Sequence, residues 1–160
     1  MMHRKHRSRN FPAASAQIRG SAAFPDIYGT VRLRQLQNGV LLTAEIHGLP
    51  ESSSRNPEQP AIFGFHIHSG SACTGTEADP FSDAGSHFNP GQTPHPSHAG
   101  DLPPLFGSHG YAYMAVFTDR FTVDEVLGHA IIIHRDPDDF TTQPAGNSGA
   151  RIACGIIRPA

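Results

Sequence analysis

The chain has 160 residues, and 12 Lys and Arg stand against 14 Asp and Glu, which gives a formal net charge of −2 with histidine neutral. This length favours one domain with a substantial core, and the charge balance argues against a nucleic-acid-binding protein, which would carry a basic surface. No apolar run approaches the roughly 20 residues that a membrane-spanning helix needs.

The first ten residues are strongly basic, with Arg4, Lys5, Arg7 and Arg9. We expect residues 1–13 to form a disordered, solvated tail before a domain at 14–160; the alternative is a patch that touches a polyanionic surface. Residues 11–25 lack the apolar stretch of a secretory signal. The expected compartment is therefore the cytoplasm.

Three strands are predicted early in the chain, at 17–23, 29–37 and 40–47. Val31 and Leu33 alternate with arginines, and the period of two indicates a strand. The pattern slips at Gln35, which falls on the apolar face, so we expect a bulge or an early strand end there. Asn38-Gly39 then predicts the turn of an antiparallel hairpin.

Further strands are predicted at 61–68, 111–118, 126–134 and 151–157, with loops at 49–60, 69–110 and 135–150. Phe63, Phe65 and Ile67 are expected on one face of the 61–68 strand, and His66 and His68 on the other. We find no convincing amphipathic helix and no repeat. Seven or eight short strands separated by turns indicate a β-sandwich or barrel.

Histidine is the unusual component of this chain, with 11 residues. His66 and His68 are two residues apart on one strand face, so both rings can approach one ion. Such a pair also occurs in cupins, α-carbonic anhydrases and metallo-β-lactamases. Metallo-β-lactamases place an Asp two residues after the pair, where this chain has Gly70. Cupins place a Glu shortly after the pair, but the first acidic residue downstream in this chain is Glu77. A zinc hydrolase would need a nearby general base, and no Glu neighbours the pair.

A second group is more specific. His87, His95, His98 and Asp101 are spaced by 8, 3 and 3 residues in the long loop. Three imidazoles and a carboxylate suit tetrahedral Zn²⁺. His134 ends the strand at 126–134. One such histidine is most simply explained as a hydrogen-bonded loop or edge residue, but six of them with an aspartate favour a metal centre.

The chain resembles copper/zinc superoxide dismutases in several segments that occur in the order of that family: GFHIH (64–68), AGSHFNP (84–90), HAGDLP (98–103), IIIHRDPDDF (131–140) and GNSGARIACGII (146–157). The resemblance, with the strand count, implies an all-β fold. It would be an eight-stranded antiparallel Greek-key barrel or sandwich, immunoglobulin-like, with two long functional loops.

The resemblance also implies the metal ligands and their supporting residues. Copper would be held by His66, His68, His87 and His134, and zinc by His87, His95, His98 and Asp101. Asp138 would hydrogen-bond one histidine of each metal, here His66 and His95, and so orient both rings. Arg151 would attract and dock the superoxide anion. Cys73 and Cys154 would form a disulfide.

The function that this resemblance implies is dismutation of two superoxide anions to O₂ and H₂O₂ by cycling of the histidine-bound copper, with zinc as the structural metal. In the family's mechanism the residue matching His87 leaves reduced copper, takes a proton and passes it to the departing peroxide. The alternative is a non-catalytic copper or zinc carrier on the same fold. Superoxide is the expected partner, without nucleic acid or a membrane span. Family relatives include homodimers and monomers, and a disulfide would favour an extracytoplasmic compartment.

Overall fold

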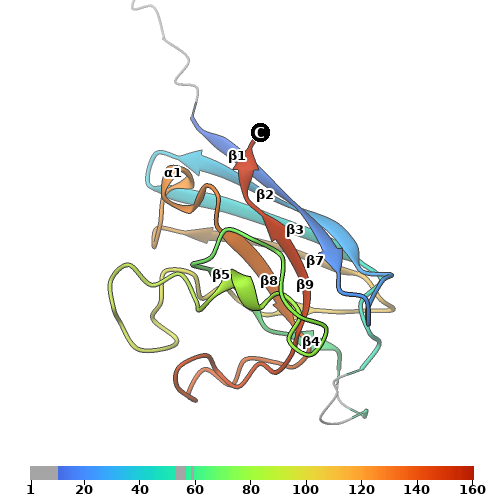
Figure 1. Ribbon diagram of the computed structural model, residues 1–160. Coiled ribbons are helices and arrows are strands. Elements are labelled where there is room, and N and C mark those ends of the chain that lie inside the picture. Colours follow the sequence, from blue (N-terminus) through green and yellow to red (C-terminus); the bar gives the residue numbers. More distant parts are fainter. Residues whose placement is uncertain (1–10, 53–56, 59) are drawn as a thin grey trace, which may run out of the picture.

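The computed structural model describes residues 11–52, 57–58 and 60–160 (Figure 1). The four basic residues of the expected tail lie outside these ranges. The regular secondary structure of the described chain consists almost entirely of antiparallel strands: β1 (Ala13–Gly20), β2 (Tyr28–Leu36), β3 (Gly39–His47), β4 (Ile62–Phe63), β5 (Phe65–His68), β6 (Leu105–Phe106), β7 (Ala112–Thr118), β8 (Ala130–His134), β9 (Arg151–Ile156) and β10 (Arg158–Pro159). One 3₁₀ turn, η1 (Ser82–Ala84), and one short helix, α1 (Val123–Val126), interrupt them.

The strands form one curled sheet in the order β5-β8-β9-β1-β2-β3-β7, and β10 pairs with β1. β4 and β6 pair with each other in a second, two-stranded ladder. β4 continues through Gly64 into β5 at one end of the large sheet, and β6 precedes β7 at the other. The small ladder therefore connects the two ends of the sheet. The predicted all-β antiparallel architecture is confirmed.

The core lies inside the curled sheet and follows the alternation of the sequence. Val40, Leu42, Ala44 and Ile46 of β3 are completely buried, as the period of two predicts. The largest fully buried side chains come from strands all around the sheet, and include Phe63, Phe65, Ile18, Leu33, Ile67, Ile131 and Ile133. A smaller cluster of Ala84, Ala130, Ile132 and Cys154 lies apart from this core.

The first strand begins earlier than predicted, at Ala13 instead of residue 17, and ends at Gly20 instead of residue 23. Ala14, Ala16 and Ile18 alternate as buried residues along it. Alanine has little strand preference of its own, so this segment carries no clear strand signal. Its position comes from pairing with β2 over seven residues.

Of the two alternatives predicted near Gln35, the bulge is absent, and the strand ends at Leu36, one residue before its predicted end. β2 pairs with β3 without a register shift as far as Leu36 and Gly39, so the turn residues are Gln37 and Asn38. Gln35 remains on the inner side because its amide has specific partners. Its Nε2 donates to the carbonyl oxygens of Leu36 and Gly39, at 3.1 Å and 3.0 Å.

Three later predictions also need correction. The strand predicted at 61–68 is divided at Gly64 into β4 and β5, and the loop predicted at 69–110 contains η1 and β6. The strand predicted at 126–134 begins only at Ala130, because Val123–Val126 is helical. Thr122 and Glu125 form a capping box, with the Thr122 amide donating to Glu125 Oε2 at 2.7 Å. This Thr-x-x-Glu pattern is a recognised helix start, so the helix could have been predicted.

Two long connections determine where chemistry can occur. One follows β5 and runs to β6, and the other joins β8 to β9 (Figure 1). They touch each other, because the His95 amide donates to Gln143 Oε1 at 3.0 Å and Gln143 Nε2 donates to the His95 carbonyl at 2.6 Å. The two loops predicted to be functional therefore meet beside β5 and β8.

Candidate metal centre

Four imidazoles come together at the end of the β5–β8 ladder. His66 and His68 come from β5, His134 ends β8, and His87 comes from the long connection after β5. One nitrogen of each ring lies within 4.8 Å of the corresponding nitrogen of every other ring. All four side chains are buried, with at most 5% of each residue exposed. We call these four residues the first group.

A second group lies directly beside it and shares His87. Its other members are His95, His98 and Asp101, and its ligand atoms also lie within 4.8 Å of one another. Asp101 is at the centre of this group: Oδ1 is 2.7 Å from His87 Nδ1, and Oδ2 is 3.1 Å from His95 Nδ1. The His66 and His87 ring centroids are only 4.0 Å apart, so the two groups are contiguous.

The loop reaches the first group by pairing with β5. β5 is the last strand of the sheet path, so one of its edges is free to bond elsewhere. The Ile67 amide donates to the Gly100 carbonyl at 2.9 Å, and the Phe88 amide donates to the Ile67 carbonyl at 2.8 Å. Isolated bridges pair His66 with Asp101 and His68 with His87. Satisfying the strand edge thus places His87 and Asp101 against the His66-x-His68 pair.

Backbone carbonyls fix the ring nitrogens that face away from the first group. His68 Nδ1 donates to the Gly85 carbonyl at 2.8 Å, and His134 Nδ1 donates to the Gly149 carbonyl at 3.1 Å. A carbonyl only accepts, so in each neutral ring Nε2 carries a lone pair. These two Nε2 atoms face each other at 3.2 Å. Two lone pairs at that distance repel, and a cation bound by both removes the repulsion.

Burial keeps three imidazoles of the first group neutral, those of His66, His68 and His134. Burial, followed by the proximity of His134, lowers the pKa of His68 to about 2. Burial and the nearby His66 likewise lower the pKa of His134 to about 3. For His66, burial lowers the pKa more than its hydrogen bond to Asp138 raises it. Metals bind the neutral form of imidazole, so these rings are ready to coordinate at neutral pH.

A test of metal fit is whether buried polar atoms lack partners where an ion would bind. Across the part of the chain that the structure describes, His66 Nδ1, His87 Nε2 and His95 Nδ1 are the buried side-chain nitrogen or oxygen atoms without a hydrogen bond. His95 Nδ1 lies 3.1 Å from Asp101 Oδ2 without forming a hydrogen bond to it. All three belong to the two groups, and an unpartnered buried polar atom is costly. The residues therefore fit two adjacent metal ions.

Asp138 connects the two groups from behind. Its Oδ2 accepts from His66 Nε2 at 2.7 Å, and its Oδ1 accepts from His95 Nε2 at 2.9 Å. Burial raises the pKa of this carboxyl, but hydrogen bonds from His66, the Phe140 amide and His95 outweigh it and lower the pKa to about 2. Only glycine fits at Gly146, because an added Cβ would collide with Asp138 Oδ1 and lie 2.7 Å from His95 Nε2.

Arg151 lies at the entrance to the first group. It lines, with His68, His87 and His134, an open cavity of about 470 Å³. Its Nη1 donates to the Phe81 carbonyl at 2.6 Å and its Nη2 to the Gly85 carbonyl at 2.9 Å. The Gly85 carbonyl therefore accepts from both Arg151 and His68. This arrangement holds a cation beside the buried imidazoles.

The disulfide between Cys73 and Cys154 is confirmed. It joins the connection after β5 to β9, close to the carbonyls that hold Arg151. Sequence reasoning missed three supporting groups, namely the Gly85 and Gly149 carbonyls and the Gln143 side chain. Backbone carbonyls carry no sequence signal, because every residue has one. Gln143 stands in no recognisable motif.

Comparison with known proteins agrees with this geometry. The sequence model of copper/zinc superoxide dismutase matches residues 27–157. The chain is similar to a Cu-Zn superoxide dismutase of Photobacterium leiognathi, at 37% identity over 144 residues, which cover 81% of this chain and 78% of that protein. A Cu-Zn superoxide dismutase of Actinobacillus pleuropneumoniae is 35% identical over 145 residues, covering 81% and 72%. The chain belongs to the copper/zinc superoxide dismutase family.

A solved structure supports the same conclusion for the fold. The Cu/Zn superoxide dismutase from Brucella abortus superposes with a TM-score of 0.74 at 26% identity, covering 90% of this chain and 98% of that one. Family membership makes the chain a superoxide dismutase, an oxidoreductase that acts on superoxide, with copper and zinc as its cofactors. The non-catalytic carrier is not favoured. No helix in the described ranges is long and apolar enough to cross a membrane.

Acidification is expected to destabilise the metal-free protein. The pKa values of His68 and His134 are lowered from 6.5 to about 2 and about 3 in the folded state. Below 6.5 the unfolded chain takes up protons that the folded chain does not, so stability falls with pH until those lower values are reached. Each histidine contributes about 1.4 kcal/mol per pH unit in that window.

Urea unfolding of the metal-free protein at a series of pH values measures this loss. The two histidines together predict a decrease of about 2 kcal/mol from pH 6.5 to about 5.5, because in the unfolded chain they are already half protonated at pH 6.5. The variant His134→Asn removes one of the two groups and should give a shallower slope. An unfolding free energy that stays constant over this window in the wild-type chain would contradict the prediction.

Proposed function

We propose that this chain carries out dismutation, 2 O₂⁻ + 2 H⁺ → O₂ + H₂O₂, at the two groups, with the first group holding copper and the second holding zinc. The observation that carries the proposal is that both groups are complete and share the His87 ring. His87 Nδ1 faces Asp101 in the second group, and Nε2 belongs to the first. One imidazole would then bridge the two ions.

The chemistry of the donor sets supports this division. The first group consists of imidazoles only, a ligand that both oxidation states of copper accept. The second adds the Asp101 carboxylate to three imidazoles, which suits the tetrahedral preference of zinc. Asp138 bonds to His66 of one group and His95 of the other, and so would keep both rings oriented.

Copper, when bound, supplies the one-electron oxidation and reduction that dismutation requires. The residues of the chain bind the anion and move protons. Arg151 would attract superoxide into the cavity of about 470 Å³ and hold it beside the imidazoles. His87 lines the same cavity, and its Nε2 has no hydrogen-bond partner within the described ranges. We assign to this nitrogen the proton that is passed to the departing peroxide.

Metal analysis combined with an activity measurement tests this proposal. The protein is purified from its native host, its copper and zinc are measured, and superoxide decay is followed on the same sample. Equal amounts of the two metals and decay much faster than with free copper support dismutation. A metal-loaded sample no faster than free copper overturns it.

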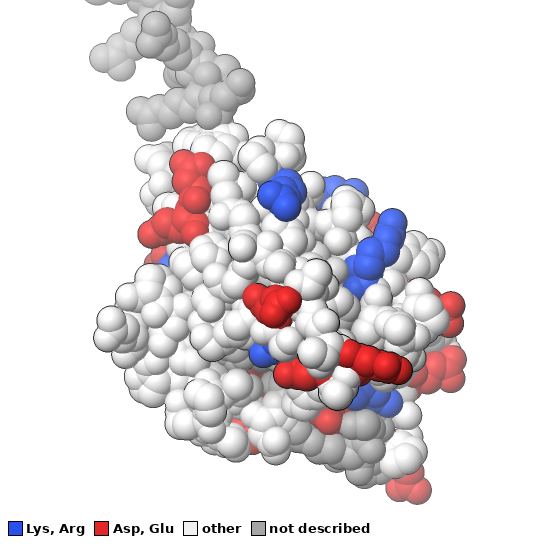
Figure 2. Space-filling view, viewed as in Figure 1, with Lys and Arg blue, Asp and Glu red and all other residues white. Residues whose placement is uncertain are grey.

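Replacement of Arg151 by alanine should lower kcat/KM for superoxide about tenfold and weaken its dependence on ionic strength. The face shown in Figure 2 carries acidic and basic side chains interspersed among uncharged ones. The charge of Arg151 at the cavity should therefore attract superoxide more than the surface charges as a whole do. Stopped-flow superoxide decay at several salt concentrations measures both effects. Arg158→Ala, at an exposed position on β10, is the control. Unchanged activity and salt dependence in Arg151→Ala would remove Arg151 from the mechanism.

We also infer a homodimer and an oxidising compartment for a domain that spans residues 14–160 and also includes Ala13, the first residue of β1. Phe106 on β6 is 66% exposed, and such an apolar side chain supports a two-fold contact. The Cys73–Cys154 bond supports an extracytoplasmic location, because cytosolic thiols are kept reduced.

Sedimentation analysis tests the dimer: Phe106→Ser should give a monomer, and a wild-type chain that is already monomeric contradicts the inference. Fractionation of native cells tests the location.

A further inference from the structure

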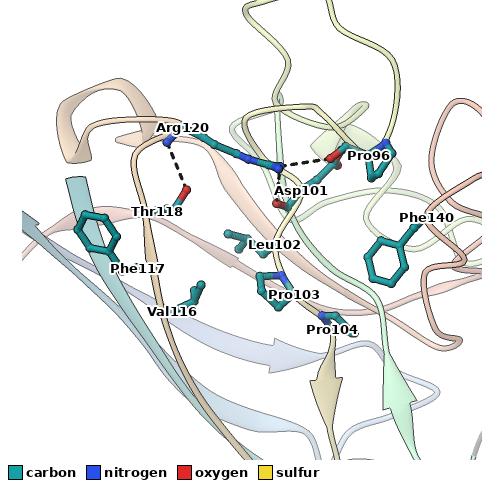
Figure 3. A pocket seen from close by; sticks show the side chains of 10 residues that line it. All are labelled: Pro96, Asp101, Leu102, Pro103, Pro104, Val116, Phe117, Thr118, Arg120 and Phe140. Atoms are coloured by element: carbon teal, nitrogen blue, oxygen red, sulfur yellow. Dashed lines mark hydrogen bonds between the residues drawn. The ribbon is translucent and has the colours of Figure 1, made fainter. Parts of the chain in front are cut away.

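Arg120 binds the backbone of the loop that carries the second group. It lies between β7 and α1, and its Nη1 donates to the carbonyl oxygens of Pro96, His98 and Asp101, at 3.2, 3.3 and 3.4 Å. Figure 3 shows the guanidinium extended toward Pro96 and Asp101. One cationic nitrogen thus bonds to three carbonyl oxygens within a segment of six residues.

The loop segment 95–101 contains all three of these carbonyls. It supplies three of the four ligands of the second group, His95, His98 and Asp101. The Asp101 carboxylate also accepts from the His98 amide at 3.0 Å. Arg120 bonds to the carbonyls of two of these ligand residues, so it acts on the backbone from which the ligands project.

Arg120 is itself held in place by a chain of hydrogen bonds. Its amide donates to Thr118 Oγ1 at 3.2 Å at the end of β7. The helix that follows starts with the Thr122–Glu125 capping box. The Val123 amide then donates to Gln35 Oε1 at 2.9 Å. The polar residue that interrupts the apolar pattern of β2 therefore anchors the segment that carries Arg120.

The surroundings of Arg120 direct its charge to the loop. Over the described ranges, no carboxylate forms an ion pair with its guanidinium, and the guanidinium donates to backbone carbonyls. It borders a groove of about 400 Å³ whose other walls are largely apolar, formed by Leu102, Pro103, Pro104, Val116, Phe117 and Phe140 (Figure 3). A guanidinium has only donors, so carbonyl oxygens are the acceptors available to it on this side.

We propose that Arg120 is a positioning residue for the zinc ligands: it holds segment 95–101 in the conformation in which His95, His98 and Asp101 face one another. The proposal rests on the assignment of zinc to the second group. A site held together in advance loses less conformational freedom when the ion binds, so Arg120 raises zinc affinity without touching the ion. Supporting residues of this kind typically change metal affinity 10- to 100-fold.

The test is zinc affinity of the metal-free protein, measured by competition with a chromophoric chelator. Arg120→Met keeps an unbranched stem and removes the donors, and should weaken zinc binding about 10- to 100-fold. Arg120→Lys keeps a cationic donor and should bind zinc more tightly than the Met variant. Arg34→Ala, an exposed arginine on β2, is the matched control. Cobalt(II) bound in place of zinc should show a changed visible spectrum in Arg120→Met, because the ligands are arranged differently.

If Arg120→Met has the same zinc affinity and cobalt spectrum as Arg34→Ala, the proposal is overturned. This holds even if Arg120→Met unfolds at a lower temperature, because a loss of stability alone indicates a purely structural residue. Should the Met variant fail to fold, the Lys variant decides by the same two measurements. Asp101→Ala separates this inference from the proposed function. If both Asp101→Ala and Arg120→Met bind zinc normally, the zinc assignment itself is wrong. If Arg120→Met binds zinc normally but Asp101→Ala does not, only the role proposed for Arg120 is wrong.

Discussion

Replacing His134 by alanine is expected to abolish copper binding and to reduce superoxide decay to the level of the metal-free protein, while zinc is retained. His134 belongs to the first group only, and its Nε2 faces His68 Nε2 at 3.2 Å. Its loss removes one of four imidazoles and leaves the Gly149 carbonyl without this donor. The second group keeps all its ligands. Copper and zinc contents and superoxide decay, measured on one sample, check the result.

His129→Ala provides a control one residue before β8. This ring is only partly buried and bonds through Nδ1 to the Ser69 carbonyl at 2.9 Å, outside both groups. It should keep both metals and full activity. Equal loss of copper and zinc in His134→Ala, with both retained in His129→Ala, would contradict the division of ligands between the two groups.

Removing the disulfide, as Cys73→Ala with Cys154→Ala, is expected to lower the free energy of unfolding by roughly 4–5 kcal/mol on the chain-entropy account. The two cysteines are separated by 81 positions, so their bond constrains a large part of the unfolded chain. Cys154 is also buried in the smaller apolar cluster. For a domain of this size, Tm should fall by roughly 10–15 °C. Thermal unfolding of the metal-free protein measures the change.

The wild-type chain treated with a reductant is the matched comparison, because it loses the bond without losing side-chain volume. It should lose most of the same stability. The oxidised wild type and the double variant melting at the same temperature would show that the bond contributes nothing. Because the linked loop carries the carbonyls that hold Arg151, we also expect kcat/KM to decrease in the double variant.

The strands that alternate clearly were predictable from the sequence. Val40 to Ile46 follow a period of two, and the His66-x-His68 pair lies on one face of β5 as that period requires. Each of these inferences needs only the local geometry of a strand. The shared position of His87 came from family resemblance, because spacing within a loop does not determine where its residues meet.

Other features depend on contacts between distant segments. β1 is a strand of small residues fixed by its pairing with β2, and the inward Gln35 is explained only by its bonds to Gly39 and Val123. The Gly85 and Gly149 carbonyls orient His68 and His134 by backbone conformation. Arg120 lies 19 residues after Asp101, and no local pattern connects them.

The oxygen of Gly85 accepts hydrogen bonds from the ring of His68 and from the guanidinium of Arg151, at 2.8 Å and 2.9 Å. Both side chains are therefore tied to the same atom. Thermal drift of that stretch would carry imidazole and guanidinium along together and leave their mutual spacing nearly constant. The separation between the imidazoles of the first group and the guanidinium that we propose to bind superoxide would thus change little when the surrounding chain fluctuates.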